Sequence, residues 1–243
     1  MNFATTSTNF VNLLHVDNWV FDLDNTLYPA TCDLFAGIDA RIQEFVARTL
    51  QLPPDEARRV QKDFYAKHGT TLNGLMKVHG LQPDEFLDFV HDIDLSPLDL
   101  APDIAAELAA LPGRRYIFTN GSLRHAEQVT RRMKIDHLFD GMIDIAASGF
   151  TPKHEPAAHD RFLESTGIDP AKSTMFEDLA RNLVPAHEKG FTTILVRSTK
   201  DWSREPDGAR PAGPGDHPPH VHHVADDLAQ FLGTARVKRA DAA

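Results

Sequence analysis

The chain has 243 residues, 42% of them hydrophobic, and its 35 acidic and 25 basic side chains give a formal net charge of −10 at pH 7. An acidic surface repels the phosphate backbone of nucleic acids, which argues against a nucleic-acid polymer as partner, and the apolar run at residues 10–14 is too short for a signal peptide or a membrane span. The single cysteine, Cys32, excludes an intrachain disulfide, so we expect a soluble cytoplasmic protein without a membrane partner.

The first predicted element is a strand that begins at Trp19, where an uninterrupted apolar Trp-Val-Phe run is typical of a parallel strand buried on both faces. Asp22 and Asp24 follow it, at the end of the strand where open α/β sheets bind ligands. A buried carboxylate without a partner is costly, and a hard cation would keep both aspartates charged. The pair therefore indicates Mg²⁺ and phosphate chemistry, while an Asp-Asn turn that merely ends the strand is the alternative.

Helical spacing of apolar side chains predicts four helices and no strong strand in the next segment. The helices are expected over residues 33–50, from the Pro53-Pro54 pair to about residue 67, from about residue 72 to Gly80, and over residues 83–91. A helical bundle inserted directly after the first strand is expected to form a small cap domain over residues 30–94.

Alternating strands and helices follow the insertion and predict a doubly wound, Rossmann-like α/β fold with a parallel sheet. Strands are expected at residues 116–119, 142–146, 173–176 and 192–196, and helices at residues 102–111, 122–133, 155–167, 179–189 and 226–232. This α/β core would comprise residues 1–29 and 95–243.

Residues 198–223 are rich in Pro, Gly, Asp and Arg and lack apolar spacing, so we expect a long surface loop. Four histidines gather near its end, at positions 217, 220, 222 and 223. A transition-metal site is one interpretation. We favour a solvated histidine-rich loop, because no cysteine and no regular ligand spacing accompany the histidines.

Polar residues follow four of the predicted strands or the segments after them. They are Asp22 and Asp24, Thr119-Asn120-Gly121, Lys153, and Glu177-Asp178. Each of the last three also has a simpler explanation when taken singly. Thr119 could end a strand, Lys153 could be a solvated lysine, and Glu177-Asp178 could cap a helix. Because the carboxyl ends of parallel strands share one edge, we expect all four to converge on a ligand. The set combines a nucleophile, phosphate donors, a cation and metal ligands.

The order of these motifs over residues 16–232 resembles that of the haloacid dehalogenase-like phosphohydrolases. The resemblance implies that Asp22 is a nucleophile that forms an aspartyl-phosphate and that Asp24 is the general acid and base. It also implies phosphoryl binding by Thr119, Asn120 and Gly121 and charge neutralisation by Lys153. Mg²⁺ would be bound by Asp22, Asp178 and the main-chain carbonyl of Asp24, with Glu177 and Asn182 orienting water and ligands.

Within that superfamily the closer resemblance is to the pyrimidine 5′-nucleotidase group. It is carried by residues 21–29, 68–75, 90–94, 117–121 and 176–183. It implies that the substrate is a small phosphorylated metabolite, with a nucleoside 5′-monophosphate as first choice. One departure is His154, since relatives usually carry proline after the lysine. We favour ordinary exposure for His154, and the alternative is that it tunes the site or shapes access to it.

The cap turn at residues 68–71 is expected to select the leaving group, because the other motifs are all assigned to phosphate and metal. Thr70 and Thr71 offer hydroxyls to a base or sugar, and the equal alternative is that Thr70 is only the N-cap of the next helix.

Other functions weighed are a sugar-phosphate phosphatase or phosphomutase, a dehalogenase, a phospho-accepting receiver and an inactive scaffold. Asp24 argues against a dehalogenase, since dehalogenases lack that second aspartate. Receivers are shorter and have no inserted cap, and the complete set of catalytic residues argues against a scaffold.

Overall fold

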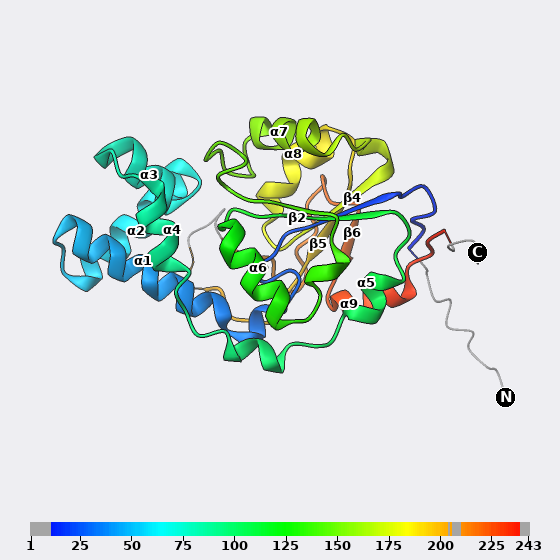
Figure 1. Cartoon of the computed structure of the whole chain (residues 1–243), viewed down its shortest axis with the longest axis horizontal. Helices are drawn as coiled ribbons and strands as arrows, with labels where there is room; N and C mark the ends of the chain where they lie inside the picture. The colour runs from blue at the N-terminus through cyan, green and yellow to red at the C-terminus, as the bar shows by residue number, and fades with distance from the viewer. Residues whose placement is uncertain (1–10, 204, 206–209, 239–243) are drawn as a thin grey trace.

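The computed structural model describes residues 11–203, 205 and 210–238, and its centre is a six-stranded parallel sheet (Figure 1). The strand order is β3-β2-β1-β4-β5-β6. The strands are β1 (Asn18–Phe21), β2 (Arg114–Phe118), β3 (Gly141–Ile143), β4 (Ser173–Glu177), β5 (Thr192–Val196) and β6 (His223–Ala225). The predicted doubly wound parallel fold is thus confirmed. The strand order reverses between β1 and β4, which is where folds of this class bind ligands.

Helices cover both faces of the sheet, with α7 and α8 on one face and α5, α6 and α9 on the other (Figure 1). Their bounds are α5 (Ala105–Ala109), α6 (Leu123–Arg132), α7 (Pro156–Thr166), α8 (Leu183–Glu188) and α9 (Leu228–Thr234). Short 3₁₀ turns lie at Ala30–Cys32, Ser96–Leu100, Asp136–Leu138, Pro170–Lys172 and Ala180–Asn182. Of the helices in the described residues, none is both long and apolar enough to cross a membrane.

The central strand β1 contributes side chains to both hydrophobic clusters of the sheet. Trp19 and Phe21 lie in one cluster and Val20 in the other, and all three are fully buried. Phe21 stacks on Phe176 of the neighbouring strand β4, with ring centroids 4.6 Å apart. Burial on both faces explains why this strand reads as a continuous apolar run, and it fixes the residue that follows, Asp22, at the middle of the sheet edge.

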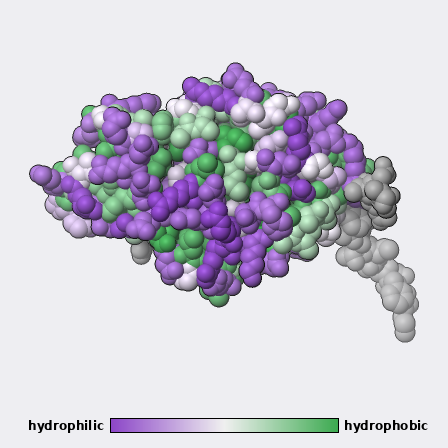
Figure 2. All heavy atoms as spheres, viewed as in Figure 1, coloured by the Kyte–Doolittle hydropathy of each residue, from purple (hydrophilic) through white to green (hydrophobic). Residues whose placement is uncertain are grey.

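The four helices of the insertion lie beside the sheet and are close to their predicted bounds (Figure 1). They are α1 (Leu34–Leu50), α2 (Pro54–His68), α3 (Thr71–His79) and α4 (Pro83–Val90). They share a separate hydrophobic cluster around Phe45, Phe64, Leu75 and Phe86, to which the core segment after β3 adds Ile145. We call these four helices the cap. The face of the molecule shown in Figure 2 is mostly hydrophilic, with hydrophobic residues scattered among the polar ones.

Several predicted elements need correction. The expected strand at 142–146 is Gly141–Ile143, the expected helix at 102–111 is only Ala105–Ala109, and the expected helix at 179–189 is a 3₁₀ turn followed by Leu183–Glu188. Pro185 has no amide to donate to the carbonyl four residues before it, which accounts for the late start of α8, and Pro112 disfavours a helical conformation at the residue before it, which accounts for the early end of α5. Strand β6 was not predicted, because three residues are too few to show a period of two.

The segment at 198–223 is not simply a surface loop, as its composition suggested. Ala212 and Val221 are buried, and Trp202 and Glu205 line the main cavity. His220 hydrogen-bonds the Ala180 carbonyl at 2.7 Å, and His222 lies 2.8 Å from Thr193 Oγ1. Among the described residues, the possible metal ligands that lie close enough together to hold an ion are three carboxylates at the edge of the sheet, and these histidines do not form such a group.

Candidate active site

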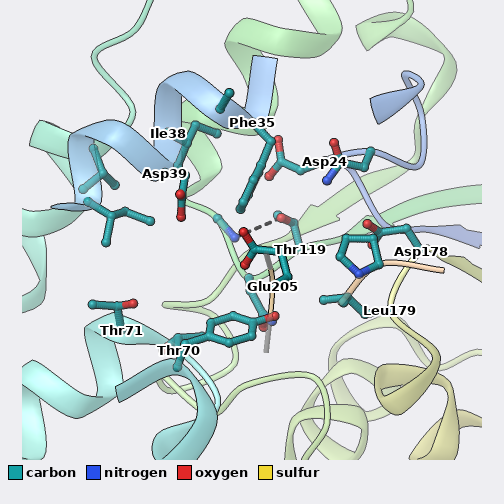
Figure 3. A pocket seen from close by; sticks show the side chains of 18 of the residues that line it. Asp24, Phe35, Ile38, Asp39, Thr70, Thr71, Thr119, Asp178, Leu179 and Glu205 are labelled. Atoms are coloured by element: carbon teal, nitrogen blue, oxygen red, sulfur yellow. Dashed lines mark hydrogen bonds between the residues drawn. The ribbon is translucent and has the colours of Figure 1, made fainter. Parts of the chain in front are cut away.

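The carboxyl edge of the sheet faces a cavity of about 470 Å³ whose other side is lined by the cap. Asp22 follows β1 directly, and its amide still donates to the Phe176 carbonyl at 2.9 Å, so its position is held by the sheet. Figure 3 shows Thr70 and Thr71 of the cap across the cavity from Asp24 and Asp178. The structure therefore brings the predicted polar strand ends together in one place, as parallel strands require.

Lys153 is the only lysine in the described residues that is almost completely buried, with an exposed fraction of 1%. Its Nζ donates to Asp22 Oδ1, to Glu177 Oε2 at 2.6 Å and to the Phe118 carbonyl at 3.1 Å. These three acceptors use all three ammonium protons. Burial lowers the pKa of Lys153, but Asp22 and Glu177 outweigh it, and the net pKa is raised. Lys153 is therefore a charged group between two carboxylates, which excludes the alternative of a solvated lysine.

The loop around Lys153 is fixed by two further contacts. Its amide donates to Asn120 Oδ1 at 3.0 Å, and its carbonyl lies 2.8 Å from His159 Nε2. The loop thus keeps the lysine in place with His154 where relatives have proline. His154 itself packs against the cap, since a Cβ added to Gly69 would meet its ring carbon Cε1 at 2.0 Å. His154 is thus a contact between the core and the cap rather than an ordinary exposed residue, and its effect on access to the site stays a prediction.

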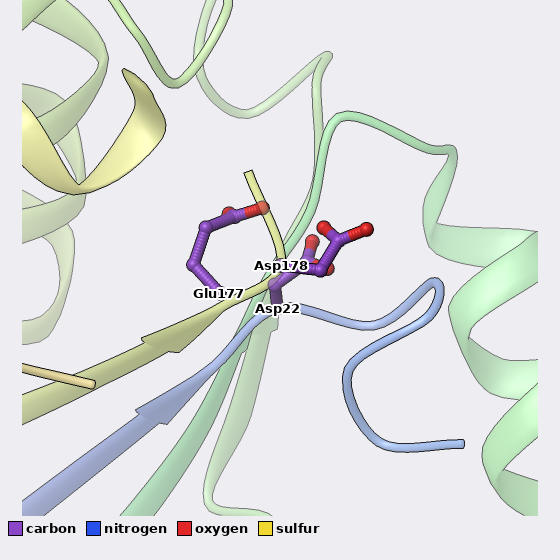
Figure 4. Close-up of side chains that lie close together, drawn as sticks. All are labelled: Asp22, Glu177 and Asp178. Carbon is purple, nitrogen blue, oxygen red and sulfur yellow. The ribbon is translucent and has the colours of Figure 1, made fainter. Parts of the chain in front are cut away.

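Three buried carboxylates form the acidic cluster found at this edge (Figure 4). Ligand oxygens of Asp22, Glu177 and Asp178 all lie within 4.8 Å of one another. Burial, with the charge of Glu177, raises the pKa of Asp22 to about 7 against the opposing effect of Lys153. Burial and the two neighbouring acids raise the pKa of Asp178 well above its usual range.

The donor set fits a hard divalent cation. Asp178 Oδ2 and Asn182 Oδ1 are buried and have no hydrogen-bond partner in the structure, so two oxygens are left that a cation could satisfy. Glu177 was predicted to orient water and ligands without binding the metal itself. In the structure its carboxylate lies within the acidic cluster and also accepts from the Leu179 amide at 3.2 Å. The Asp24 carboxylate is not part of this cluster.

Asp24 has partners of its own that the sequence did not suggest. Its Oδ1 accepts from the Tyr28 hydroxyl at 2.6 Å and lies 2.8 Å from His125 Nε2. Burial raises the pKa of Asp24, but His125 and Tyr28 outweigh it and hold the pKa below its usual value. The ring of His91 stacks on that of His125, with centroids 4.5 Å apart. His125 lies in the first turn of the helix after the Thr119 loop. This position near the edge of the sheet was the signal in the sequence that could have identified it as a site residue.

The Thr119 loop is partly engaged in its own hydrogen bonds. Thr119 is 2% exposed and lines the cavity, and its Oγ1 accepts from the Gly121 amide at 2.9 Å. The Gly121 amide was predicted to help bind a phosphoryl group, but here it stabilises the loop. Ser122 caps α6 by accepting from the His125 amide at 3.3 Å. Because Thr119 Oγ1 accepts the bond from the Gly121 amide, its hydroxyl proton is left for another acceptor, whereas the first amide of α6, that of Leu123, donates to Asp144 Oδ2 at 2.9 Å.

The cap side of the cavity combines apolar and charged residues. Lys62 Nζ lies 2.9 Å from Asp39 Oδ1 and 2.8 Å from Glu205 Oε2, and so ties the segment after β5 to helices α1 and α2. Thr70 accepts from the Asn73 amide at 3.0 Å, and Thr71 donates to the Gln61 carbonyl at 3.2 Å. Both hydroxyls of the predicted selectivity turn thus have partners within the cap, although both residues line the cavity.

Comparisons with known proteins agree with this geometry. A family model for haloacid dehalogenase-like hydrolases matches residues 16–188. Phosphate metabolism protein 8 of Saccharomyces cerevisiae is 31% identical over 134 residues, which are 50% of this chain and 41% of that protein. The chain therefore matches less than half the length of this curated relative.

Solved structures share the fold at low identity. A haloacid dehalogenase-like phosphatase from Thermococcus onnurineus is 19% identical, with a TM-score of 0.57 over 91% of this chain and 100% of that chain. The L-2-haloacid dehalogenase from Xanthobacter autotrophicus is 18% identical, with a TM-score of 0.53 over 90% of this chain and 97% of that chain. Since a phosphatase and a dehalogenase fit about equally well, the fold leaves the reaction open and the site has to decide it.

Proposed function

Because the chain belongs to the haloacid dehalogenase-like hydrolases, we propose that it hydrolyses a small phosphomonoester through an aspartyl-phosphate on Asp22, with Mg²⁺ as cofactor. The observation that carries this proposal is Asp24, which lines the same cavity as Asp22 and has hydrogen-bond partners separate from those of the acidic cluster. A dehalogenase attacks carbon and has no alcohol to protonate, whereas a phosphatase needs this second carboxyl group.

The proposed reaction assigns a role to each residue of the site. An oxygen of Asp22 attacks phosphorus, and the bond from phosphorus to the leaving oxygen breaks as Asp24 gives that oxygen its proton. Water then attacks the aspartyl-phosphate and passes a proton back to Asp24, which releases phosphate and restores the Asp22 carboxylate. Lys153 and the Thr119 hydroxyl would compensate the charge that develops on the phosphoryl oxygens.

Asp22, Asp178 and the Asp24 carbonyl would hold the cation, with Glu177 and Asn182 beside them. A bound Mg²⁺ supplies positive charge to the phosphoryl oxygens and offsets the repulsion within the cluster. We propose residues 30–94 as a cap domain and residues 1–29 and 95–243 as the catalytic core. Water exclusion by the cap would favour phosphoryl transfer to a compact substrate.

As substrate we propose a nucleoside 5′-monophosphate, a pyrimidine nucleotide first. The residues at 68–75 that resemble the pyrimidine 5′-nucleotidase group include Thr70 and Thr71, which line the cavity. The cavity volume of about 470 Å³ is in the range of small-molecule sites. The name of the yeast relative also refers to phosphate metabolism. A sugar phosphate is the second candidate, because the same phosphate-binding residues would accept it.

The test is phosphate release by the full chain from a panel of nucleoside 5′-monophosphates, sugar phosphates and p-nitrophenyl phosphate, with Mg²⁺ or with EDTA. The proposal predicts hydrolysis that needs Mg²⁺ and is fastest with a pyrimidine nucleotide. Equal activity in EDTA would reject the metal, and faster turnover of a sugar phosphate would reject the nucleotide. Absence of any hydrolysis would reject the phosphatase.

A further inference from the structure

One oxygen of the Asp24 carboxylate takes both of its hydrogen bonds. Tyr28 and His125 both contact Oδ1, at 2.6 and 2.8 Å, and among the residues that the structure describes Oδ2 has no hydrogen-bond partner. The Asp24 side chain is 14% exposed and lines the cavity, whereas that of His125 is completely buried. The two oxygens of this carboxylate are therefore in different environments, one fixed by the protein and one left for a ligand.

The direction of the His125 hydrogen bond follows from chemistry. An ionised carboxylate only accepts hydrogen bonds, so the proton must be on His125 Nε2. His125 Nδ1 is buried without a partner, which is less costly for a bare ring nitrogen than for a second N–H group. We infer that the proton of this hydrogen bond is on Nε2, an assignment made from the hydrogen-bond network.

The His125 ring is held from two sides. Ser122 Oγ accepts from the His125 amide at 3.3 Å and lies 3.0 Å from His91 Nδ1. The His91 ring in turn stacks on the His125 ring at 4.5 Å and 15°. His91 directly follows the last cap helix, so the group that fixes Asp24 is packed against the end of the cap.

We propose that His125 is a positioning residue for Asp24, which with Tyr28 occupies one carboxylate oxygen so that the other exchanges the proton with the leaving group. This inference rests on the proposed function. It assigns to His125, which does not touch the reacting atoms, a share of the general-acid effect, because a misplaced acid loses much of its advantage. Tyr28 alone would leave the carboxylate freer to rotate.

The experiment compares two leaving groups through kcat/KM, which reports phosphoryl transfer to Asp22. One substrate is the alkyl phosphomonoester that the wild-type chain hydrolyses best in the panel above. The other is p-nitrophenyl phosphate, whose leaving group departs with little help from an acid. We expect His125→Phe, which keeps a ring beside His91, to lower the alkyl value about 10- to 100-fold and the aryl value less than about 3-fold.

Conservative variants separate hydrogen bonding from packing. His125→Gln can place an N–H near the position of Nε2 and should restore part of the alkyl value, whereas His125→Asn places its N–H near Nδ1 and should not. His137→Phe is the control, because that histidine side chain is 69% exposed and away from the cavity residues. It should leave both values unchanged.

Equal losses for both substrates, or no loss for either, would overturn the positioning role while leaving the phosphatase intact. A wild-type chain without any phosphatase activity would reject the proposed function and this inference together. If the His125 variants do not fold, the ¹⁵N spectrum of the wild-type histidines decides. A ring protonated on Nε2 whose signals shift in Asp24→Asn supports the inference, and a ring protonated on Nδ1 contradicts it.

Discussion

Lys153 shows how one buried residue makes the site possible. Asp22 and Glu177 are 5% and 1% exposed, and both carboxylates contact the same ammonium group. Two buried negative charges that contact the same group repel each other strongly, and a cation between them removes most of the free-energy cost of that repulsion. The lysine therefore stabilises the fold as well as the developing charge in the reaction.

We expect Lys153→Met to destabilise the metal-free protein by about 3–5 kcal/mol, because it leaves two buried carboxylates without their partner. The matched control is Lys67→Met, which breaks a surface pair with Asp63 whose side chains are 65% and 48% exposed, and which should cost about 1 kcal/mol or less. Urea unfolding in EDTA measures both. Equal costs for the two variants would contradict the structural role of Lys153.

The raised pKa of Asp22 predicts how the stability of the metal-free protein depends on pH. Its pKa is raised from 3.8 to about 7 by burial and by Glu177, so near neutral pH the folded chain holds a proton that the unfolded chain has lost. Stability should therefore fall as the pH rises through about 7, and Asp178 should act in the same direction. Urea unfolding in EDTA at about pH 6 and 8 tests this. The Asp22→Asn variant should show a smaller decrease, and an unchanged decrease would contradict the assignment.

At the scale of elements, the turn between α2 and α3 connects the cap to the core. Gly69 has φ +81°, its carbonyl accepts from Arg181 at 3.3 Å, and its α-carbon faces His154. A side chain at this position would be strained by the backbone and would also collide with the imidazole. Glycine thus allows the turn to lie directly on the core.

We expect Gly69→Ala to be more harmful than Gly80→Ala. Gly80 ends α3 at φ +66° with nothing within 4 Å of an added Cβ, so its substitution measures backbone strain alone, about 1 kcal/mol. Thermal unfolding and KM are the measurements, and Gly69→Ala should affect both. Adding His154→Ala should rescue Gly69→Ala in part and leave Gly80→Ala unchanged. Equal effects of the two glycine substitutions would show that the contact with His154 contributes neither to stability nor to substrate binding.

Thr70 and Thr71 test whether this turn also selects the leaving group. The Thr70 hydroxyl is the N-cap of α3, so Thr70→Ala should cost about 0.5–2 kcal/mol of stability. A selectivity role further requires that Ala at both positions change kcat/KM for UMP, CMP and AMP relative to one another, with p-nitrophenyl phosphate little affected. If all four values fall together, the turn acts only through stability.

The elements that the sequence predicted well are those with a strong local signal. The run before Asp22 is apolar because β1 is buried on both faces, and the cap helices show helical spacing over at least two turns. Strand β6 and the segment around Trp202 have no such signal, because their positions come from packing against distant parts of the chain. Composition alone therefore described a surface loop where the structure has part of a cavity wall.

At the scale of the whole molecule, the predicted residues at the four strand ends do meet in one cavity, because strand order alone brings those ends together. The contact of His125 with Asp24 joins residues 101 positions apart and depends on how α6 packs, which no local pattern encodes. The same holds for His154, whose partner lies in the cap. The sequence was thus informative about the reacting groups and silent about the residues that hold them.

Metal binding should be visible in the stability of the whole chain. Mg²⁺ that binds the acidic cluster only in the folded state raises the unfolding temperature with concentration. We expect this increase in the wild type and a much smaller one in Asp178→Asn, measured by thermal unfolding. Asp84→Asn, on the outer side of the cap at the start of α4, is the control and should behave like the wild type. An equal increase in all three proteins would place the bound metal elsewhere.

The central claim is that Asp22 carries the phosphoryl group, and chemical trapping tests it most directly. The Asp24→Asn variant, in which hydrolysis of the intermediate should be slowed by about 10²–10⁴-fold, is mixed with Mg²⁺ and p-nitrophenyl phosphate, whose leaving group departs with little help from an acid, and is then reduced with borohydride. An aspartyl-phosphate is converted to homoserine, which peptide mass spectrometry locates. The account predicts homoserine at position 22, absent without substrate and absent when Asp22→Asn is added to the variant. Substrate turnover by the Asp22→Asn protein at the wild-type rate, with no homoserine at position 22 in the trapped enzyme, would contradict it.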